Sequence, residues 1–173
     1  KFYLEIGVLA QKKDYFEIKE LLIQNRKRID PEVYFYYWGL VENAFSNFKE
    51  SNEAIETFFE AFHQRDSIKL QSVCNENLVL HSISESGNGT KFSVEKASNF
   101  YKSIASIPLT MKFEEKILSY KIQIDGAMAH VWTPYEFYVN EKLSHSGVNS
   151  FQLFLENGVW KVVYILDTRR KSL

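Results

Sequence analysis

Three short turns separate four long segments of alternating apolar and polar residues near the C-terminus. The segments run over about 111–124, 127–139, 143–155 and 159–168, and the turns are Asp125-Gly126, Asn140-Glu141-Lys142 and Asn157-Gly158. Asp-Gly and Asn-Gly between alternating runs are strong hairpin signals, because glycine tolerates the positive φ that a two-residue turn requires. The pattern therefore predicts a meander of long antiparallel strands, and this meander constrains the fold more than any other feature.

The first 66 residues have helical periodicity instead. Asp30-Pro31 predicts the start of a helix that runs to about Asn47, since a capping residue followed by proline favours helix initiation. Another helix is expected from about Asn52 to Arg65, followed by a short one that ends near Cys74. Residues 77–83 then predict a strand, 84–90 a loop and 93–106 a helix that stops before Pro108.

Composition excludes several classes of function. The chain has 173 residues and a net charge of −1, which gives no electrostatic footprint for nucleic acid or an anionic membrane. Cys74 is the one cysteine, so no internal disulfide forms. No apolar run is long enough to span a membrane, the histidines lack metal-ligand spacing, and no cofactor motif is present. We therefore predict no metal and no cofactor.

The cellular compartment stays open. The chain begins at Lys1, within a predicted helix, so a trimmed product and a removed signal peptide are both compatible with it. We expect a soluble protein that is either cytoplasmic or exported.

From about Asn52 onward, the order helix, short helix, strand, helix and meander resembles the nuclear transport factor 2-like superfamily. This is the cone-shaped α+β fold of ketosteroid isomerase and the SnoaL-like polyketide cyclases. The residues that carry the likeness are EAIETFFEAFHQRDSIKLQSVC, ASNFYKSI and GVWKVVYILDTRR. The resemblance implies a curved antiparallel sheet packed by helices, with a helical hairpin extension before it.

The extension resembles a tetratricopeptide helix pair, on the spacing of Trp38, Val41, Phe45, Ala54, Phe58 and Ala61. One pair is too short for a binding solenoid, because stacked repeats must bury each other. We therefore predict two domains: residues 1–51 as the extension and residues 52–173 as the cone.

Each hairpin fixes a strand register, and the register decides which face of the sheet a residue occupies. The three turns predict the pairs Ile122–Ala129, Leu118–Thr133, Phe137–His145, Thr133–Asn149, Val131–Phe151, Leu155–Trp160, Leu153–Val162 and Phe151–Tyr164. These registers agree with one another and place alternate residues, among them Thr133, His145 and Asn149, on one inner face toward the helices. That face has no carboxylate among its central residues.

Polar side chains on the inner face predict a pocket. Buried polar groups without partners cost about 1–3 kcal/mol each, so they pair with one another, with water or with a ligand. Cones of the superfamily are commonly hollow at the wide end, which implies a ligand site. We expect its lining to be Tyr120, Thr133, Tyr135, Asn149 and Tyr164, with His145 beside them and His81 reaching in. The alternative is an internal hydrogen-bonded cluster without a ligand.

Three functions fit these residues. The first is a binding protein for a small apolar or partly polar molecule. The second is an isomerase or cyclase-type enzyme with His145 as general base and Tyr135 or Tyr120 donating to an oxyanion. The third is a protein–protein interaction module that uses the helical extension.

The opposite face of the sheet is too apolar for plain solvent contact. Trp132, Val148, Val163 and Ile165 are expected there. Since members of the superfamily often dimerise through this face, the resemblance implies a homodimer. A β-bulge that the sequence does not reveal would exchange the faces and bring Asp167 and Arg169 inside.

Overall fold

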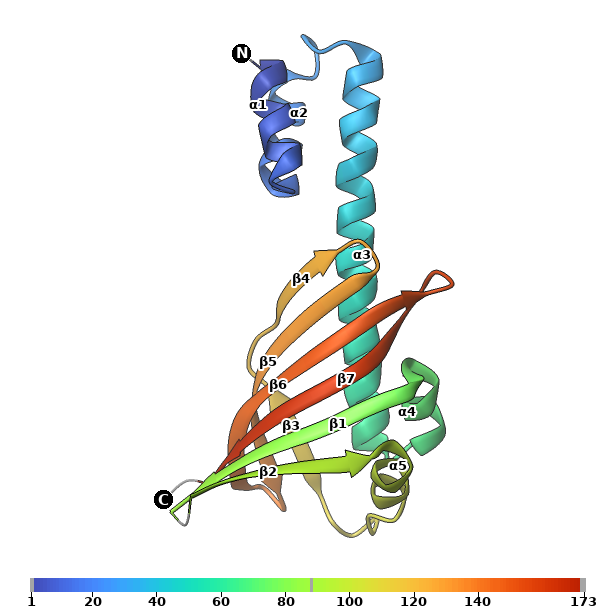
Figure 1. Cartoon of the computed structure of the whole chain (residues 1–173), viewed down its shortest axis with the longest axis vertical. Helices are drawn as coiled ribbons and strands as arrows, with labels where there is room; N and C mark the ends of the chain where they lie inside the picture. The colour runs from blue at the N-terminus through green and yellow to red at the C-terminus, as the bar shows by residue number, and fades with distance from the viewer. Residues whose placement is uncertain (1, 88, 172–173) are drawn as a thin grey trace. The chain divides into compact units, whose positions relative to one another are not determined.

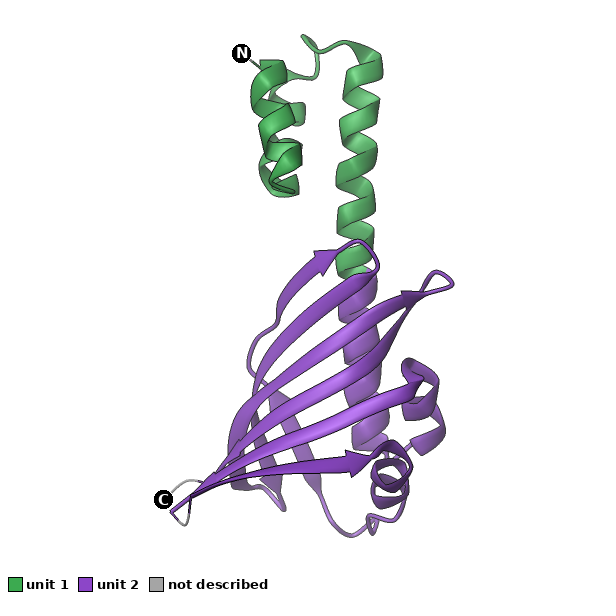
Figure 2. Ribbon diagram, in the orientation of Figure 1, with its two compact units in different colours: residues 1–49 green, residues 50–173 purple. Residues whose placement is uncertain are grey.

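The computed structural model describes residues 2–87 and 89–171. The chain forms two compact units, residues 1–49 and residues 50–173, coloured separately in Figure 2. Figure 1 gives the element labels. Among the described residues, no helix is both long and apolar enough to cross a bilayer.

The first unit contains α1 (Phe2–Gln11), α2 (Tyr15–Asn25) and the beginning of α3 (Pro31–Gln64). Its core consists of Ile6, Ile18, Leu22, Ile29 and Val41. Asp30 starts α3 as the sequence predicts, because its Oδ1 accepts hydrogen bonds from the backbone N–H groups of Glu32 and Val33.

The prediction of two helices over 31–47 and 52–65 was wrong, because α3 is continuous from Pro31 to Gln64. Residues 48–51 are Phe, Lys, Glu and Ser, and neither glycine nor proline interrupts the helical hydrogen bonds there. The boundary between the two compact units lies inside this helix.

The second unit is α+β, as the sequence predicts. After α3 come α4 (Ser67–Val73), β1 (Cys74–Ser86), β2 (Gly89–Lys96) and α5 (Ala97–Ala105). The meander follows as β3 (Phe113–Ile117), β4 (Lys121–Asp125), β5 (Met128–Val139), β6 (Lys142–Glu156) and β7 (Val159–Arg170). These strands form one curved sheet in the order β2-β1-β7-β6-β5-β3, with β4 also paired to β5 (Figure 1).

Two details differ from the sequence-based expectation. The sheet is mixed rather than wholly antiparallel, because β1 runs parallel to β7. The helix predicted over 93–106 begins only at Ala97, because residues 93–96 pair with β1 as part of an antiparallel hairpin. For these four residues, pairing with β1 outweighs the local helical periodicity.

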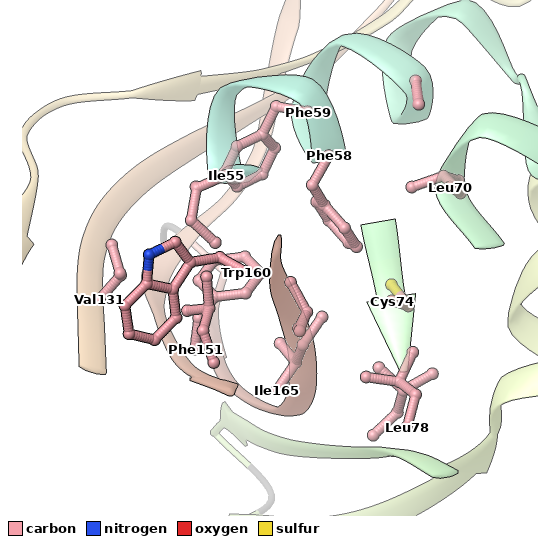
Figure 3. Packing of buried hydrophobic residues seen from close by; sticks show 14 of the residues in the cluster. Ile55, Phe58, Phe59, Leu70, Cys74, Leu78, Val131, Phe151, Trp160 and Ile165 are labelled. Atoms are coloured by element: carbon pink, nitrogen blue, oxygen red, sulfur yellow. The ribbon is translucent and has the colours of Figure 1, made fainter. Parts of the chain in front are cut away.

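The core of the second unit lies between the sheet and the helices. Phe58 and Phe59 of α3 contact Phe151 of β6, with ring centroids 5.4 and 5.7 Å apart. Leu70, Cys74 and other buried residues complete the cluster, as Figure 3 shows. The helices therefore pack on the concave face of the sheet. Every second side chain of each strand points to this face.

The predicted β5–β6 register is confirmed at Phe137–His145, Thr133–Asn149 and Val131–Phe151. The β6–β7 register is confirmed only near the turn, at Leu155–Trp160 and Leu153–Val162. A bulge then shifts the pairing, so Phe151 pairs with Ile165 rather than with Tyr164. Every later residue of β7 is therefore on the face opposite to the one predicted.

The predicted strand 111–124 is also interrupted. Residues 118–120 leave the ladder between β3 and β4, and this break changes the alternation. The turn before β5 is Gly126-Ala127 rather than Asp125-Gly126, so Ile122 pairs with Val131 instead of Ala129. Upstream of the break, Ile117 pairs with Tyr135 and shares its face of the sheet. Leu118 is consequently 53% exposed rather than buried on the inner face, and Glu115 is turned inward in its place.

Candidate ligand-binding site

A cavity of about 580 Å³ lies within the second unit, between the concave face of the sheet and helices α3 and α5. Its apolar lining includes seven phenylalanines: Phe58, Phe59, Phe62, Phe100, Phe113, Phe137 and Phe151. Its polar lining includes Ser82, Ser84, Ser93, Glu95, Glu115, Tyr135, His145, Asn149, Asp167 and Arg169. The volume falls in the range of roughly 300–1,000 Å³ that is typical of small-molecule sites.

Part of the aromatic lining is a row of rings from α3, β3, β5 and β6. Phe113 lies between Phe62 and Phe137, with centroid distances of 5.2 and 6.1 Å. His145 is stacked on Phe137 at 4.9 Å and meets Tyr135 edge to face at 5.8 Å. These contacts hold the imidazole against apolar surface at one side of the cavity.

Glu115 of β3 is partly buried at the polar side of the cavity. Its Oε1 accepts a hydrogen bond of 2.6 Å from Nδ2 of Asn149. Its backbone N–H donates to Nε2 of His63 at 2.9 Å, which ties β3 to the end of α3. Glu115 lines the cavity because it pairs with Phe137, and the two therefore share the inner face.

Asp167 and Arg169 of β7 form an ion pair beside this carboxyl group. Nε of Arg169 donates to Oδ2 of Asp167 at 2.6 Å, and Nη2 donates to Oδ1 at 3.4 Å. Oγ of Ser82 adds a hydrogen bond of 3.1 Å to the same Oδ2. Asp167 pairs directly with Asn149 across the β6–β7 ladder, so the two polar clusters are neighbours.

Burial raises the pKa of Glu115 to about 7. The hydrogen bond from Asn149 and the positive charge of Arg169 lower this pKa, while the negative charge of Asp167 raises it. Removal from water disfavours the charged form more than these partners stabilise it. The carboxyl group therefore exchanges its proton near neutral pH.

The pKa of His145 is lowered from its ordinary value, first by burial and then by the charge of Arg169. The imidazole is thus mostly neutral at pH 7, with Nδ1 at 3.2 Å from Oγ of Ser144. The hydroxyl of Tyr135 donates to the carbonyl of Thr168 at 2.9 Å, and burial raises its pKa. The His145 imidazole and the Tyr135 hydroxyl therefore act as neutral hydrogen-bonding groups at pH 7.

Four of the predicted site residues border the cavity: His81, Tyr135, His145 and Asn149. Thr133 lies on the same face but is fully buried below it, and its hydroxyl has no hydrogen-bond partner among the described residues. Tyr120 lies in the break between β3 and β4, is 38% exposed and does not line the cavity.

Tyr164 differs from the expectation because of the bulge in β7. Tyr164 has the opposite orientation to Ile165 and does not line the cavity. His81 borders the cavity, but its Nδ1 is hydrogen-bonded to the Tyr164 hydroxyl at 2.9 Å, and its ring packs on Phe92. Its imidazole is therefore directed to the outer face of β1.

Sequence reasoning missed Glu115 as a site residue and included Asp167 and Arg169 only as the consequence of a bulge. The same bulge corrects the outer face: Ile165 is buried and lines the cavity, so it is not available there. Trp132 is 41% exposed, as expected for that face, and Val148 and Val163 are partly buried. Within the described residues, no three His, Cys, Asp or Glu side chains are grouped to hold a metal ion.

No family model matches the sequence, and no curated protein matches it. Solved structures match in fold. A nuclear transport factor 2-like (NTF2-like) protein of unknown function from Shewanella baltica is 14% identical with a TM-score of 0.54, and the match covers 74% of this chain and 97% of that one. A candidate dehydratase of the NTF2-like family from Streptomyces avermitilis is 14% identical with a TM-score of 0.55, covering 75% and 99%.

A third match is the beta subunit of a candidate aromatic-ring-hydroxylating dioxygenase from Novosphingobium aromaticivorans. It is 8% identical with a TM-score of 0.59, covering 75% of this chain and 93% of that one. The covered share is about what the second unit makes up of the chain. At such identities the matches establish the fold alone: the chain contains a cone of the NTF2-like fold, as the sequence resemblance predicts.

Proposed function

We propose that the protein binds a small, largely apolar molecule in the cavity of its second unit. The observation that carries this proposal is the cavity itself, about 580 Å³ in volume, with a phenylalanine lining and one convergent polar cluster. An apolar body would contact the rings, while a polar group would reach Glu115, Asn149 or Arg169. Few, well-placed polar groups in an apolar cavity are the usual design of a ligand site.

Filling the cavity should abolish binding. Ser84 of β1 lines it, whereas the adjacent Ile83 points to the other face of the strand. Ser84→Phe is expected to weaken binding of a fluorescent naphthalene probe at least about tenfold, because a phenyl ring occupies part of the volume. The matched variant Ile83→Phe should bind like wild type. Titration of probe fluorescence measures both affinities.

Native mass spectrometry of protein purified from its own source is the second measurement. A retained small molecule that Ser84→Phe releases supports the proposal. Unchanged probe affinity in Ser84→Phe, together with no retained molecule in the wild type, would contradict it.

A second candidate function is proton-transfer catalysis, and the specific observation that favours it is the acid–base behaviour of Glu115. A general acid or base works best when its pKa lies near the operating pH, and the pKa of Glu115 is about 7. This candidate replaces His145 by Glu115 as the proton-exchanging group, since the pKa of His145 is lowered. The hydroxyl of Tyr135 donates a hydrogen bond to the carbonyl oxygen of Thr168. In this arrangement Tyr135 therefore cannot stabilise an oxyanion.

Untargeted analysis of a metabolite extract incubated with the protein tests this second function. An enzyme should consume a metabolite in wild type and in His145→Gln, and should lose at least about a hundredfold in rate in Glu115→Gln, the usual scale of general acid–base catalysis. Binding without turnover leaves only the first function. A rate that depends on His145 and not on Glu115 would contradict the assignment.

The homodimer expected from the sequence stays a proposal. It is supported by the exposed indole of Trp132 and by the partly buried Val148 and Val163 on the outer face of the sheet. An apolar patch of this kind on a sheet favours association with a matching surface.

A further inference from the structure

Among the described residues, no cationic side chain forms an ion pair with the cavity carboxylate Glu115. Asp167 is neutralised by Arg169 through two hydrogen bonds. Glu115 instead makes a single side-chain hydrogen bond within the described part of the chain, from the neutral amide of Asn149 to Oε1. Its second carboxylate oxygen has no described partner. A buried carboxylate is stable as an ion only with a cation or several donors, so this site is electrostatically incomplete.

The cavity lining as a whole also contains more carboxylates than cationic side chains. The lining contains the carboxylates Glu95, Glu115 and Asp167 but only one permanently charged cation, Arg169. His145 is mostly uncharged at pH 7, because burial and Arg169 lower its pKa from 6.5. Glu95 is exposed to solvent, so when Glu115 is ionised the inner part of the lining holds two carboxylates, Glu115 and Asp167, and one guanidinium, that of Arg169.

The aromatic lining is also suited to a cation. Electron-rich ring faces attract ammonium groups by about 0.5–2 kcal/mol, more when water is excluded. Phe113 already accepts the guanidinium of Arg65, whose central carbon lies 4.9 Å from the ring centroid. The phenylalanines of the lining thus offer apolar contact to the body of a ligand and cation–π attraction to a positive head.

We propose that the ligand of this cavity is an organic amine whose protonated nitrogen binds the free oxygen of Glu115, with its apolar body among the phenylalanine rings. This inference rests on the proposed binding function and gives it a substrate class. An anionic ligand fits less well, because it would have to compete with Asp167 for Arg169 and would lie beside a second carboxyl group.

Proton linkage gives the proposal a distinctive signature. Glu115 is protonated in about half of the molecules at pH 7, since its pKa is about 7. An ammonium group requires the ionised form, so binding releases that proton and becomes tighter as the pH rises. From pH 6 to pH 8 the ionised fraction rises about tenfold, and the affinity should follow. An anion would give the opposite slope.

Other ionisable or polar groups face Glu115 from each neighbouring element: His63 on α3, Tyr135 on β5, His145 and Asn149 on β6, and Asp167 and Arg169 on β7. The pKa values of both histidines are lowered from 6.5, so both are mostly neutral at pH 7. Their remaining contribution is common to wild type and to Glu115→Gln, and the difference between the two isolates Glu115.

Three probes of matched shape test the proposal: naphthylmethylamine, naphthylmethanol and naphthoate. Isothermal titration calorimetry at pH 6 and pH 8, in two buffers with different ionisation enthalpies, gives each affinity and the number of protons released. Wild type should bind the amine at least about tenfold more tightly than the alcohol at pH 8, with about half a proton released at pH 7. Glu115→Gln should remove both effects.

Glu114→Gln is the matched control, because it removes the same charge from the neighbouring, exposed position of β3. It should preserve the preference for the amine. Equal affinity for amine and alcohol, or tighter binding of naphthoate, would overturn the amine assignment while leaving the binding function intact. If none of the three probes binds at millimolar concentration, the proposed binding function fails as well.

Discussion

Replacement of Gly147 by alanine is expected to destabilise the second unit by about 3 kcal/mol or more, beyond the usual cost of overpacking a core. A Cβ atom at this position would lie 1.7 Å from the carbonyl oxygen of Thr168 and 3.0 Å from Cε1 of Tyr135. The first contact is with backbone, so no side-chain rotation relieves it. Strand β7 would have to move away from β6.

Chemical denaturation of the full chain measures this effect, and Gly39→Ala provides the control. Gly39 is exposed in α3, and its added Cβ would meet no atom within 4 Å. Alanine there should stabilise the helix by about 0.5–1 kcal/mol, because it restricts the unfolded chain. The two substitutions are chemically identical and should act in opposite directions. A Gly147→Ala protein as stable as wild type would refute the close approach of β6 and β7.

This close approach also positions the site. The carbonyl of Thr168 accepts the Tyr135 hydroxyl, and Oγ1 of Thr168 accepts the backbone N–H of Val148. Thr168 lies between Asp167 and Arg169, and the side chains of these two residues both line the cavity. Displacement of β7 at Gly147 should therefore disturb the ion pair next to Glu115 as well as the stability of the sheet.

The contribution of sequence reasoning can be traced along the strands. The β5–β6 register is predicted correctly from Phe137–His145 onward but not beside the turn, where Val139 pairs with Lys142 and Tyr138 with Leu143. A register shift between Phe137 and Tyr138 restores the predicted pairs. The prediction for β7 is right for Trp160 and Val162, before the bulge. A bulge adds one residue without a distinctive composition, so the alternating pattern alone cannot locate it.

Glu115 was missed for a related reason. The segment Lys116–Ile122 contains no glycine or proline, so its alternating pattern predicts one uninterrupted strand. The structure breaks the ladder at 118–120, where Leu118 still donates its N–H to the carbonyl of Pro134. That break exchanges inner and outer positions upstream of it. The acidic pair Glu114-Glu115 was visible, but only the three-dimensional pairing with β5 decides which one faces the cavity.

Glu115 should lower the stability of the protein as the pH rises from about 4.5 to 7, whereas His63 and His145, whose pKa values are lowered by burial, act in the opposite direction. The folded-state pKa of this carboxyl group is about 7, against an ordinary value of 4.5. Between these values the unfolded chain has released the proton while the folded protein still holds it. The unfolded state therefore binds fewer protons in this interval, and the free energy of unfolding falls with rising pH.

Glu115→Gln should remove this dependence, because glutamine can keep the hydrogen bond from Asn149 without a charge. A shift from 4.5 to about 7 corresponds to about 3 kcal/mol at pH 8. The variant should accordingly be more stable than wild type by up to that amount at pH 8 and equal to it near pH 4.5. Urea denaturation across this range measures the difference, with Glu114→Gln as the variant that should follow wild type. A Glu115→Gln protein that is less stable than wild type at pH 8 would show that other groups of the folded protein already stabilise the ionised carboxylate. The proposal of an ammonium ligand would then lose its electrostatic basis.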